Sequence, residues 1–159
     1  MVSLVRRASS ADIGAIAAVH CEAFPRQRDS ERWVEATLAA APRMFVYTSV
    51  HEGQIAGYIF WAQKSGIRPA AVVELDQIAV LSKFQGIGLG ERLIRESLAL
   101  VTAELAANGQ SMKSILISTR ADNEAQRLYD RVLGAKVVAA IENLYSATEV
   151  LMIAENLGA

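Results

Sequence analysis

Residues 80–90 read Val80-Leu81-Ser82-Lys83-Phe84-Gln85-Gly86-Ile87-Gly88-Leu89-Gly90, with glycine at every second position from residue 86. The apolar segment before them, residues 71–80, has the composition of a β-strand, and apolar residues after them recur at a helical period to about Ala107. Glycine lets the backbone take positive φ and approach a ligand closely, and the first N–H groups of a helix have no partner within it. The segment therefore predicts an anion site where a helix begins.

Two well-known phosphate-binding loops do not match this segment. A Walker loop needs Gly-Lys followed by Ser or Thr, but Gly90 is followed by Glu91-Arg92. A dinucleotide fingerprint needs G-x-G-x-x-G in the first strand-to-helix unit, whereas this chain has G-x-G-x-G after half of its length. The loop by itself leaves open which anion it binds, or whether its glycines only permit a tight turn.

The composition limits the class of protein. A chain of 159 residues is near the usual size of one domain, so we expect a single domain over residues 1–159. The net charge of −1 provides no broad basic field, which argues against nucleic acid as the main partner. Two histidines and one cysteine are too few for an ordinary Cys/His metal site or an intramolecular disulfide, so we expect no metal and a reducing, cytoplasmic location. No apolar run is long enough to cross a bilayer, so no membrane association is expected.

The chain alternates between strand-like and helix-like segments. The predicted order is β-α-α-β-β-β-α-β-α-β-β. The strands are expected at residues 3–7, 44–50, 54–62, 71–80, 114–118, 136–140 and 145–153, and the helices from about residue 13, around 33–38, at 88–107 and at 124–133. This pattern predicts an α/β domain with a mixed sheet.

The order resembles the GNAT superfamily of acetyl-coenzyme A-dependent N-acyltransferases, and four segments carry the resemblance. They are residues 5–12, 52–57, 78–90 and 123–129. Gln85-x-x-Gly88-x-Gly90 is similar to the family's Q/R-x-x-G-x-G/A signature, and Asn123 followed by Leu128-Tyr129 is similar to its final helix. The resemblance covers almost the whole chain. It implies a central, mostly antiparallel, twisted sheet flanked by helices.

The resemblance also implies a cofactor and its contacts. The acyl donor would be acetyl-CoA, whose diphosphate would lie on main-chain N–H groups of the glycine segment. Oriented amides at a helix start can neutralise a diphosphate without magnesium. The implied coenzyme-binding residues are Ile78, Ala79, Val80, Gln85, Gly86, Ile87, Gly88, Leu89, Gly90, Glu91 and Asn123. Asn123 can instead cap the last helix, with Gln126 completing a capping-box-like pair.

Two side chains match catalytic positions of the family. Glu74 resembles the general base of some members, and Asp76 is the rival, since strand alternation would put residues 74, 76, 78 and 80 on one face unless the strand bulges. Tyr129 resembles the general acid that protonates the departing thiolate. The plainer interpretation is that the carboxylates are solvated and that the tyrosine ring packs in an apolar stripe.

The acceptor is not readable from the sequence beyond an amine of a small molecule or a peptide. The resemblance implies that residues 21–33 and 141–145 shape its site. Cys21 has His20 as its sequence neighbour, but adjacent helical side chains do not face one another, so direct transfer in a ternary complex is favoured over an acyl-cysteine route. A non-catalytic acyl-CoA-binding sensor or interaction module on the same fold is the alternative. The apolar segment 150–153 is compatible with a homodimer contact or with a core position.

Overall fold

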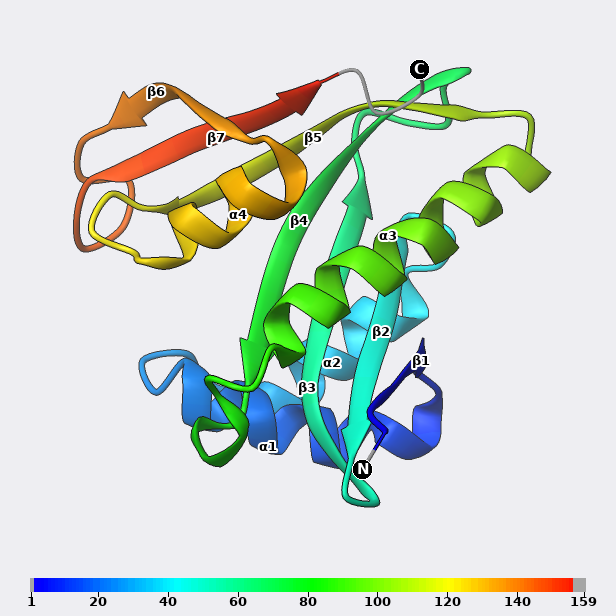
Figure 1. Cartoon of the computed structure of the whole chain (residues 1–159), viewed down its shortest axis with the longest axis vertical. Coiled ribbons are helices and arrows are strands. Elements are labelled where there is room, and N and C mark those ends of the chain that lie inside the picture. The colour runs from blue at the N-terminus through cyan, green and yellow to red at the C-terminus, as the bar shows by residue number, and fades with distance from the viewer. Residues whose placement is uncertain (1, 156–159) are drawn as a thin grey trace.

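The computed structural model describes residues 2–155 and has the predicted order of elements (Figure 1). The strands are β1 (Leu4–Arg7), β2 (Met44–His51), β3 (Gln54–Gln63), β4 (Ala70–Val80), β5 (Ser111–Arg120), β6 (Lys136–Ile141) and β7 (Glu149–Glu155). The helices are α1 (Ile13–Ala23), α2 (Ser30–Ala39), α3 (Leu89–Ala107) and α4 (Ala125–Leu133). Met1 and residues 156–159 lie outside the described residues, and the single domain over residues 1–159 stays a prediction.

Seven strands form one sheet in the order β1-β2-β3-β4-β5-β7-β6. All neighbours are antiparallel except β4 and β5, which are parallel. The mostly antiparallel mixed sheet expected from the resemblance is therefore confirmed.

β4 and β5 pair along only part of their length. Their ladder runs from the Ala70–Ser111 pair to the Leu75–Ile117 pair. Beyond it β4 continues to Val80, while β5 keeps only β7 as a neighbour. Figure 1 shows the two strands diverging, with the start of α3 close to the free end of β4. The sheet is thus open on one side of residues 76–80.

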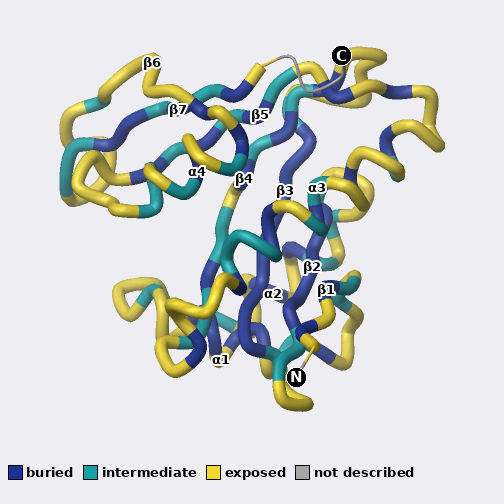
Figure 2. The backbone as a smooth tube through the Cα atoms, in the orientation of Figure 1, coloured by how far each residue is buried: buried dark blue, intermediate teal, exposed yellow. Residues whose placement is uncertain are grey.

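Helices cover both faces of the sheet. α3 and α4 pack on one face over a core that includes Trp61, Leu93 and Ile115, and α1 and α2 pack on the other over a core that includes Ile16 and Phe60. Figure 2 shows β3 buried over most of its length and β6 exposed at the sheet edge. None of the helices in the described part of the chain is both long and apolar enough to cross a membrane.

Glycine permits close approach where β3, β4 and α3 meet. A Cβ on Gly57 would lie 2.7 Å from the Ala79 carbonyl oxygen and 3.1 Å from Leu93 Cδ1. Real Cβ atoms do not come so close to backbone, so any other residue would push β3 away from β4. Gly57 thereby allows the strand pair to sit directly beneath the start of α3.

Two predicted strands, β5 and β7, differ most from the structure in their bounds. β5 covers residues 111–120 rather than 114–118, because its flanking polar residues still pair with β4 and β7. β7 begins at Glu149 rather than Tyr145. Residues 142–148 form a loop instead, and its Ser146 reaches the segment between α1 and α2.

Candidate active site

The glycine loop, defined as residues 85–91, takes the conformation that its glycines predict at two of three positions. Gly86 has φ +79° and Gly88 has φ +85°, and no atom lies within 4 Å of the place where either would carry a Cβ. Gly90 is already helical, and an added Cβ there would contact Leu128 Cδ2 at an ordinary 3.6 Å. Positive φ is therefore required at Gly86 and Gly88 but not at Gly90.

Six consecutive main-chain N–H groups, from residue 86 to residue 91, have no backbone acceptor among residues 2–155. The first hydrogen bond of the α3 turn runs from the Arg92 N–H to the Gly88 carbonyl, at 3.1 Å. The side chain of Gln85 donates through Nε2 to the Val80 carbonyl at 3.0 Å and so ties the loop to the end of β4. These amides, together with the positive end of the α3 dipole, form a site suited to an anion.

Glu91 can contribute to this site only through its main chain. Its carboxylate accepts from Arg95 Nε at 2.9 Å and from Arg131 Nη2 at 3.0 Å. Hydrogen bonds from these two guanidinium groups lower the pKa of Glu91, so its charge is directed toward α3 and α4. Ile87 is exposed, and Leu89 is buried under the loop against Ala56 and Phe84.

A bulge in β4 changes which of its residues lie on the same face of the sheet. Phe60 pairs with Gln77 and Trp61 with Leu75, so Asp76 is the extra residue opposite β3. Leu75, Ile78 and Val80 belong to the α3 and α4 side, whereas Ala79 packs with α1 and α2. The strand thus bulges, which was the stated exception to a shared face for residues 74, 76, 78 and 80, and the alternation shifts by one residue.

The candidate bases Glu74 and Asp76 are close neighbours with different partners. Glu74 Oε2 lies 2.7 Å from Lys64 Nζ in an ion pair. Asp76 has no ion-pair partner among the described residues, and more than a third of its surface is exposed. Surrounding protein atoms, and then the charge of Glu74, nevertheless raise the pKa of Asp76, while Lys64 opposes them. The two carboxylates thus differ in their partners, since a lysine pairs with Glu74 and none pairs with Asp76 among residues 2–155.

Tyr129 lies in α4 and belongs to the core on the α3 and α4 side of the sheet. Only 5% of the residue is exposed, and burial raises the pKa of Tyr129 to about 12. Its hydroxyl makes no hydrogen bond to the residues that the structure describes. The phenol is thus protonated at neutral pH and has a free O–H to donate, and the same desolvation would make a nearby thiolate more basic.

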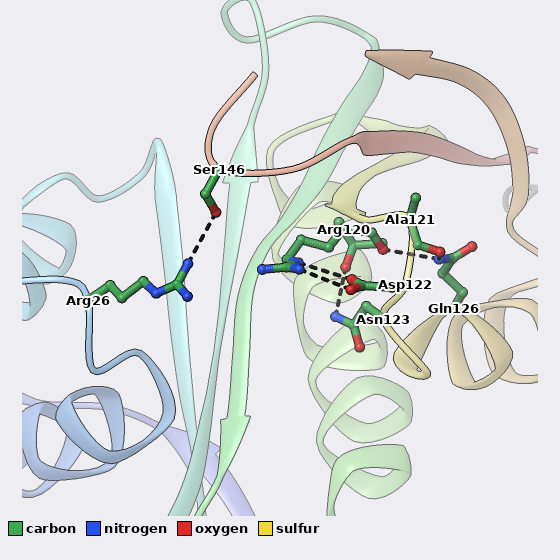
Figure 3. Close-up of polar contacts among 8 residues, drawn as sticks. Arg26, Arg120, Ala121, Asp122, Asn123, Gln126 and Ser146 are labelled. Carbon is green, nitrogen blue, oxygen red and sulfur yellow. Dashed lines mark hydrogen bonds and ion pairs between the residues drawn. The ribbon is translucent and has the colours of Figure 1, made fainter. Parts of the chain in front are cut away.

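Asn123 caps the last helix, as one of its two interpretations predicted. Its Oδ1 accepts from the Ala125 N–H at 2.9 Å, and its Nδ2 donates to Thr119 Oγ1 at 2.8 Å. The prediction that Gln126 completes a capping box is wrong. Gln126 Nε2 donates instead to the carbonyl oxygens of Arg120 and Ala121, because the chain turns back there between β5 and α4. Figure 3 shows Gln126 directed toward Arg120 and Ala121.

A buried polar network on the other face of the sheet is absent from the sequence predictions. His20 in α1 is fully buried, and its ring nitrogens contact Ser30 Oγ at 2.9 Å and Gln27 Oε1 at 2.8 Å. Gln77 Nε2 donates to the same Gln27 oxygen at 3.3 Å, and the Tyr58 hydroxyl donates to Gln77 Oε1 at 3.2 Å. The only signal in the sequence is the position of His20 on the apolar stripe of α1, next to Ile16 and Val19.

Cys21 is exposed and has no contact with the His20 ring, whose nitrogens are both bound elsewhere. The expectation that these neighbours do not form a thiol–imidazole pair is confirmed. Within residues 2–155, no three His, Cys, Asp or Glu side chains are placed so that they could hold a metal ion.

Comparisons with known proteins identify the class. The model of the acetyltransferase (GNAT) family matches residues 13–135. No curated protein sequence matches this chain significantly. Similar solved structures include NAA60 of Arabidopsis thaliana in complex with a bisubstrate analogue (TM-score 0.80, 16% identity, covering 99% of this chain and 100% of that one). They also include Ard1 of Thermoplasma volcanium (TM-score 0.75, 19% identity, 99% of each chain). A third is the aminoglycoside 6'-N-acetyltransferase of Enterococcus faecium (TM-score 0.73, 16% identity, 94% and 95%).

The chain belongs to the GNAT acetyltransferase family, because the family model matches most of its length. It is therefore an acyltransferase of the class that transfers groups other than aminoacyl groups. Similar structures have been solved with coenzyme A or acetyl-CoA bound. At these identities the structural likeness establishes the fold, and the roles of individual residues follow only from the geometry described above.

Proposed function

We propose that this protein transfers the acetyl group of acetyl-CoA to a primary amine by direct attack in a ternary complex. The observation that carries the proposal is the run of free main-chain amides at residues 86–91, located where β4 separates from β5. The residues present fit the coenzyme, since oriented amides can offset a diphosphate and the space beside Gly86 and Gly88 is open. When bound, the coenzyme supplies an activated acetyl thioester.

The α3 and α4 side would hold the coenzyme and donate a proton. Amides of residues 86–91 bind the diphosphate, and the edge of β4 at Ile78, Ala79 and Val80, which pairs only with β3, borders the gap between the parted strands. Tyr129 donates its free O–H to the departing sulfur. Asn123 holds the start of α4, and with it Tyr129, through its cap and its bond to Thr119.

The opposite side would hold the amine and remove its proton. Asp76 and Glu74 are both candidates for the base, directly or through a water. Glu74 is engaged in the ion pair with Lys64, at 2.7 Å. The raised pKa of Asp76 supports Asp76 as the proton acceptor. Glu74 then acts by keeping negative charge beside the incoming ammonium.

An amine panel assayed for release of free coenzyme A tests this proposal. Activity with at least one primary amine is expected, and Tyr129→Phe should slow transfer strongly while acetyl-CoA still binds. Binding is followed by thermal unfolding, because a ligand at a hundredfold excess over its dissociation constant adds about 2.7 kcal/mol of stability. Stabilisation by acetyl-CoA without turnover of any amine would favour the non-catalytic sensor. If acetyl-CoA does not stabilise the protein, both the acetyltransferase and the non-catalytic sensor are contradicted.

Two further expectations from the sequence stay predictions. The first is pairing of two copies. Residues 150–153, named for that contact or for the core, lie in β7 between β5 and β6, with Val150 and Met152 buried in the core. The exposed edge strand β6 is the surface that we propose for pairing instead. The second is a cytoplasmic location. Sedimentation analysis and fractionation of cells that express the protein measure them directly.

A further inference from the structure

The face from which an amine would enter follows from the placement of the coenzyme residues. The glycine loop and Tyr129 belong to the α3 and α4 side. Residues on the opposite face of β4, among them Glu74 and Gln77, face α1 and α2. An amine that attacks between the parted strands must therefore come past the segment joining α1 to α2, residues 24–29.

This α1–α2 segment is fixed to β4 by directed hydrogen bonds. The oxygen of Gln27 can only accept, so His20 donates through Nε2 and its Nδ1 accepts from the Ser30 hydroxyl. Gln77 donates to the same oxygen from β4. Because His20 is fully buried and hydrogen-bonded at both nitrogens, the segment is tied to α1 and, through Gln27, to Gln77 of β4.

Arg26 is a cation that this fixed segment presents. Its Nη1 reaches Ser146 Oγ in the β6–β7 loop at 3.3 Å, and no carboxylate in residues 2–155 forms an ion pair with it. Arg28, in the same segment, is exposed and likewise forms no ion pair within residues 2–155, whereas two cations on or next to the central strands are paired. Lys64 pairs with Glu74, and Arg120 pairs with Asp122 through two hydrogen bonds of 2.9 and 3.0 Å. Figure 3 shows Arg26 extended toward Ser146 and Arg120 bent onto Asp122.

Arg26 and Asp76 are the sequence neighbours of the two residues that form the Gln27–Gln77 hydrogen bond. Arg26 precedes Gln27 and Asp76 precedes Gln77 in the chain, and the two glutamines are hydrogen-bonded to each other. Arg26 and Asp76 are therefore each one residue away from the same hydrogen bond, and neither forms an ion pair within residues 2–155. One attracts an anion and the other an ammonium group. A zwitterionic acceptor matches both charges.

We propose that Arg26 binds a carboxylate of the acceptor and thereby selects amines that also carry a carboxylate. The inference rests on the proposed acetyl transfer and narrows its substrate class. A guanidinium presents two parallel N–H donors that match a carboxylate, and a weak bond to a neutral serine is readily exchanged for such a pair. The bound carboxylate orients the amine toward Asp76.

The test compares matched amines that differ only in the carboxylate. Suitable pairs are γ-aminobutyrate with n-butylamine and 5-aminopentanoate with n-pentylamine, in which the two amines are about equally basic. We expect kcat/KM to be about tenfold higher, or more, for the carboxylate member of at least one pair, because a hydrogen bond to a charged group contributes about 1.5–3 kcal/mol. Arg26→Gln should bring that ratio close to one, and Arg26→Lys should retain part of it.

Two variants separate charge recognition from a structural role. Ser146→Ala removes the partner of Arg26 but leaves the guanidinium, so the preference should persist. Arg28→Gln removes an exposed charge from the same segment and should also leave the preference intact. Calorimetry with the coenzyme A-saturated protein gives a second readout, in which Arg26→Gln should weaken binding of the preferred carboxylate amine about tenfold or more.

The outcomes distinguish this inference from the proposed function. Absence of coenzyme A release with every amine contradicts the proposed function itself. Release with equal kcat/KM for both members of every pair overturns only the role of Arg26. A preference that survives Arg26→Gln, or one that is lost equally in Ser146→Ala, also overturns it.

Discussion

The two halves of the candidate site are built differently. The glycine loop is one contiguous segment that offers main-chain N–H groups, and its requirement on side chains is mainly glycine where φ is positive. The acceptor side, defined as Arg26, Asp76, Ser146 and the network around His20, combines side chains from α1, β3, β4 and two loops. A main-chain site can therefore persist while a side-chain site on the same fold changes its ligand.

The largest effect should come from Asp76→Asn, because it removes the proposed base from the acceptor side. General acid–base catalysis contributes about 10²–10⁴-fold, so kcat should fall by that order. Binding of acetyl-CoA, measured by calorimetry, should remain as in the wild type. The matched variant is Glu74→Gln. If Glu74→Gln loses the larger factor and Asp76→Asn does not, Glu74 is the base instead.

Removal of the buried network should destabilise the acceptor side without affecting the glycine loop. His20→Ala leaves a cavity and deprives Ser30 and Gln27 of their partner, for which we expect a loss of about 2–4 kcal/mol in urea unfolding. Cys21→Ala, at the exposed neighbouring position, is the control and should cost little. Acetyl-CoA should still add its full increment of stability to His20→Ala. If acetyl-CoA no longer stabilised His20→Ala, the glycine loop and the acceptor side would be energetically coupled.

Two glycine substitutions compare the loop with an ordinary helix. Alanine in place of Gly88 must adopt a left-handed conformation, at a cost of about 1–2 kcal/mol, or move the amides. We expect acetyl-CoA to bind about tenfold more weakly, since about 1.4 kcal/mol corresponds to that factor. Gly14→Ala, in exposed and regular helical backbone of α1, should leave coenzyme affinity unchanged. Equal affinities for both variants would show that the positive φ at Gly88 is not needed.

The smallest effect concerns pH. Asp76 must be deprotonated to act as a base, so kcat/KM falls as pH drops through its raised pKa. Glu74→Gln removes a charge that raises this pKa, and the acid limb of the pH profile should move to lower pH. Lys64→Gln removes a charge that lowers the pKa, and the limb should move to higher pH. Shifts in the same direction, or none, would argue against Asp76.

The sequence predicted most elements and the main-chain half of the site because those depend on local patterns. Strand alternation, helical periodicity and the spacing of Gly86, Gly88 and Gly90 are all properties of neighbouring residues. The face of β4 on which Glu74 lies relative to Ile78 and Val80 was not predictable, because the bulge at Asp76 depends on the pairing with β3. The contacts of Arg26 with Ser146 and of Gln27 with Gln77 join residues far apart in the chain, which no local pattern reports.

The amide resonances of residues 86–91 provide the most direct test of the central claim, that these main-chain groups bind the coenzyme diphosphate. Isotope-labelled protein is titrated with coenzyme A and, separately, with pantetheine, which lacks the diphosphate. We predict that coenzyme A shifts these resonances more than those elsewhere in the chain, and that pantetheine leaves them near their free positions. Tight binding of coenzyme A with these amides unmoved would contradict the account.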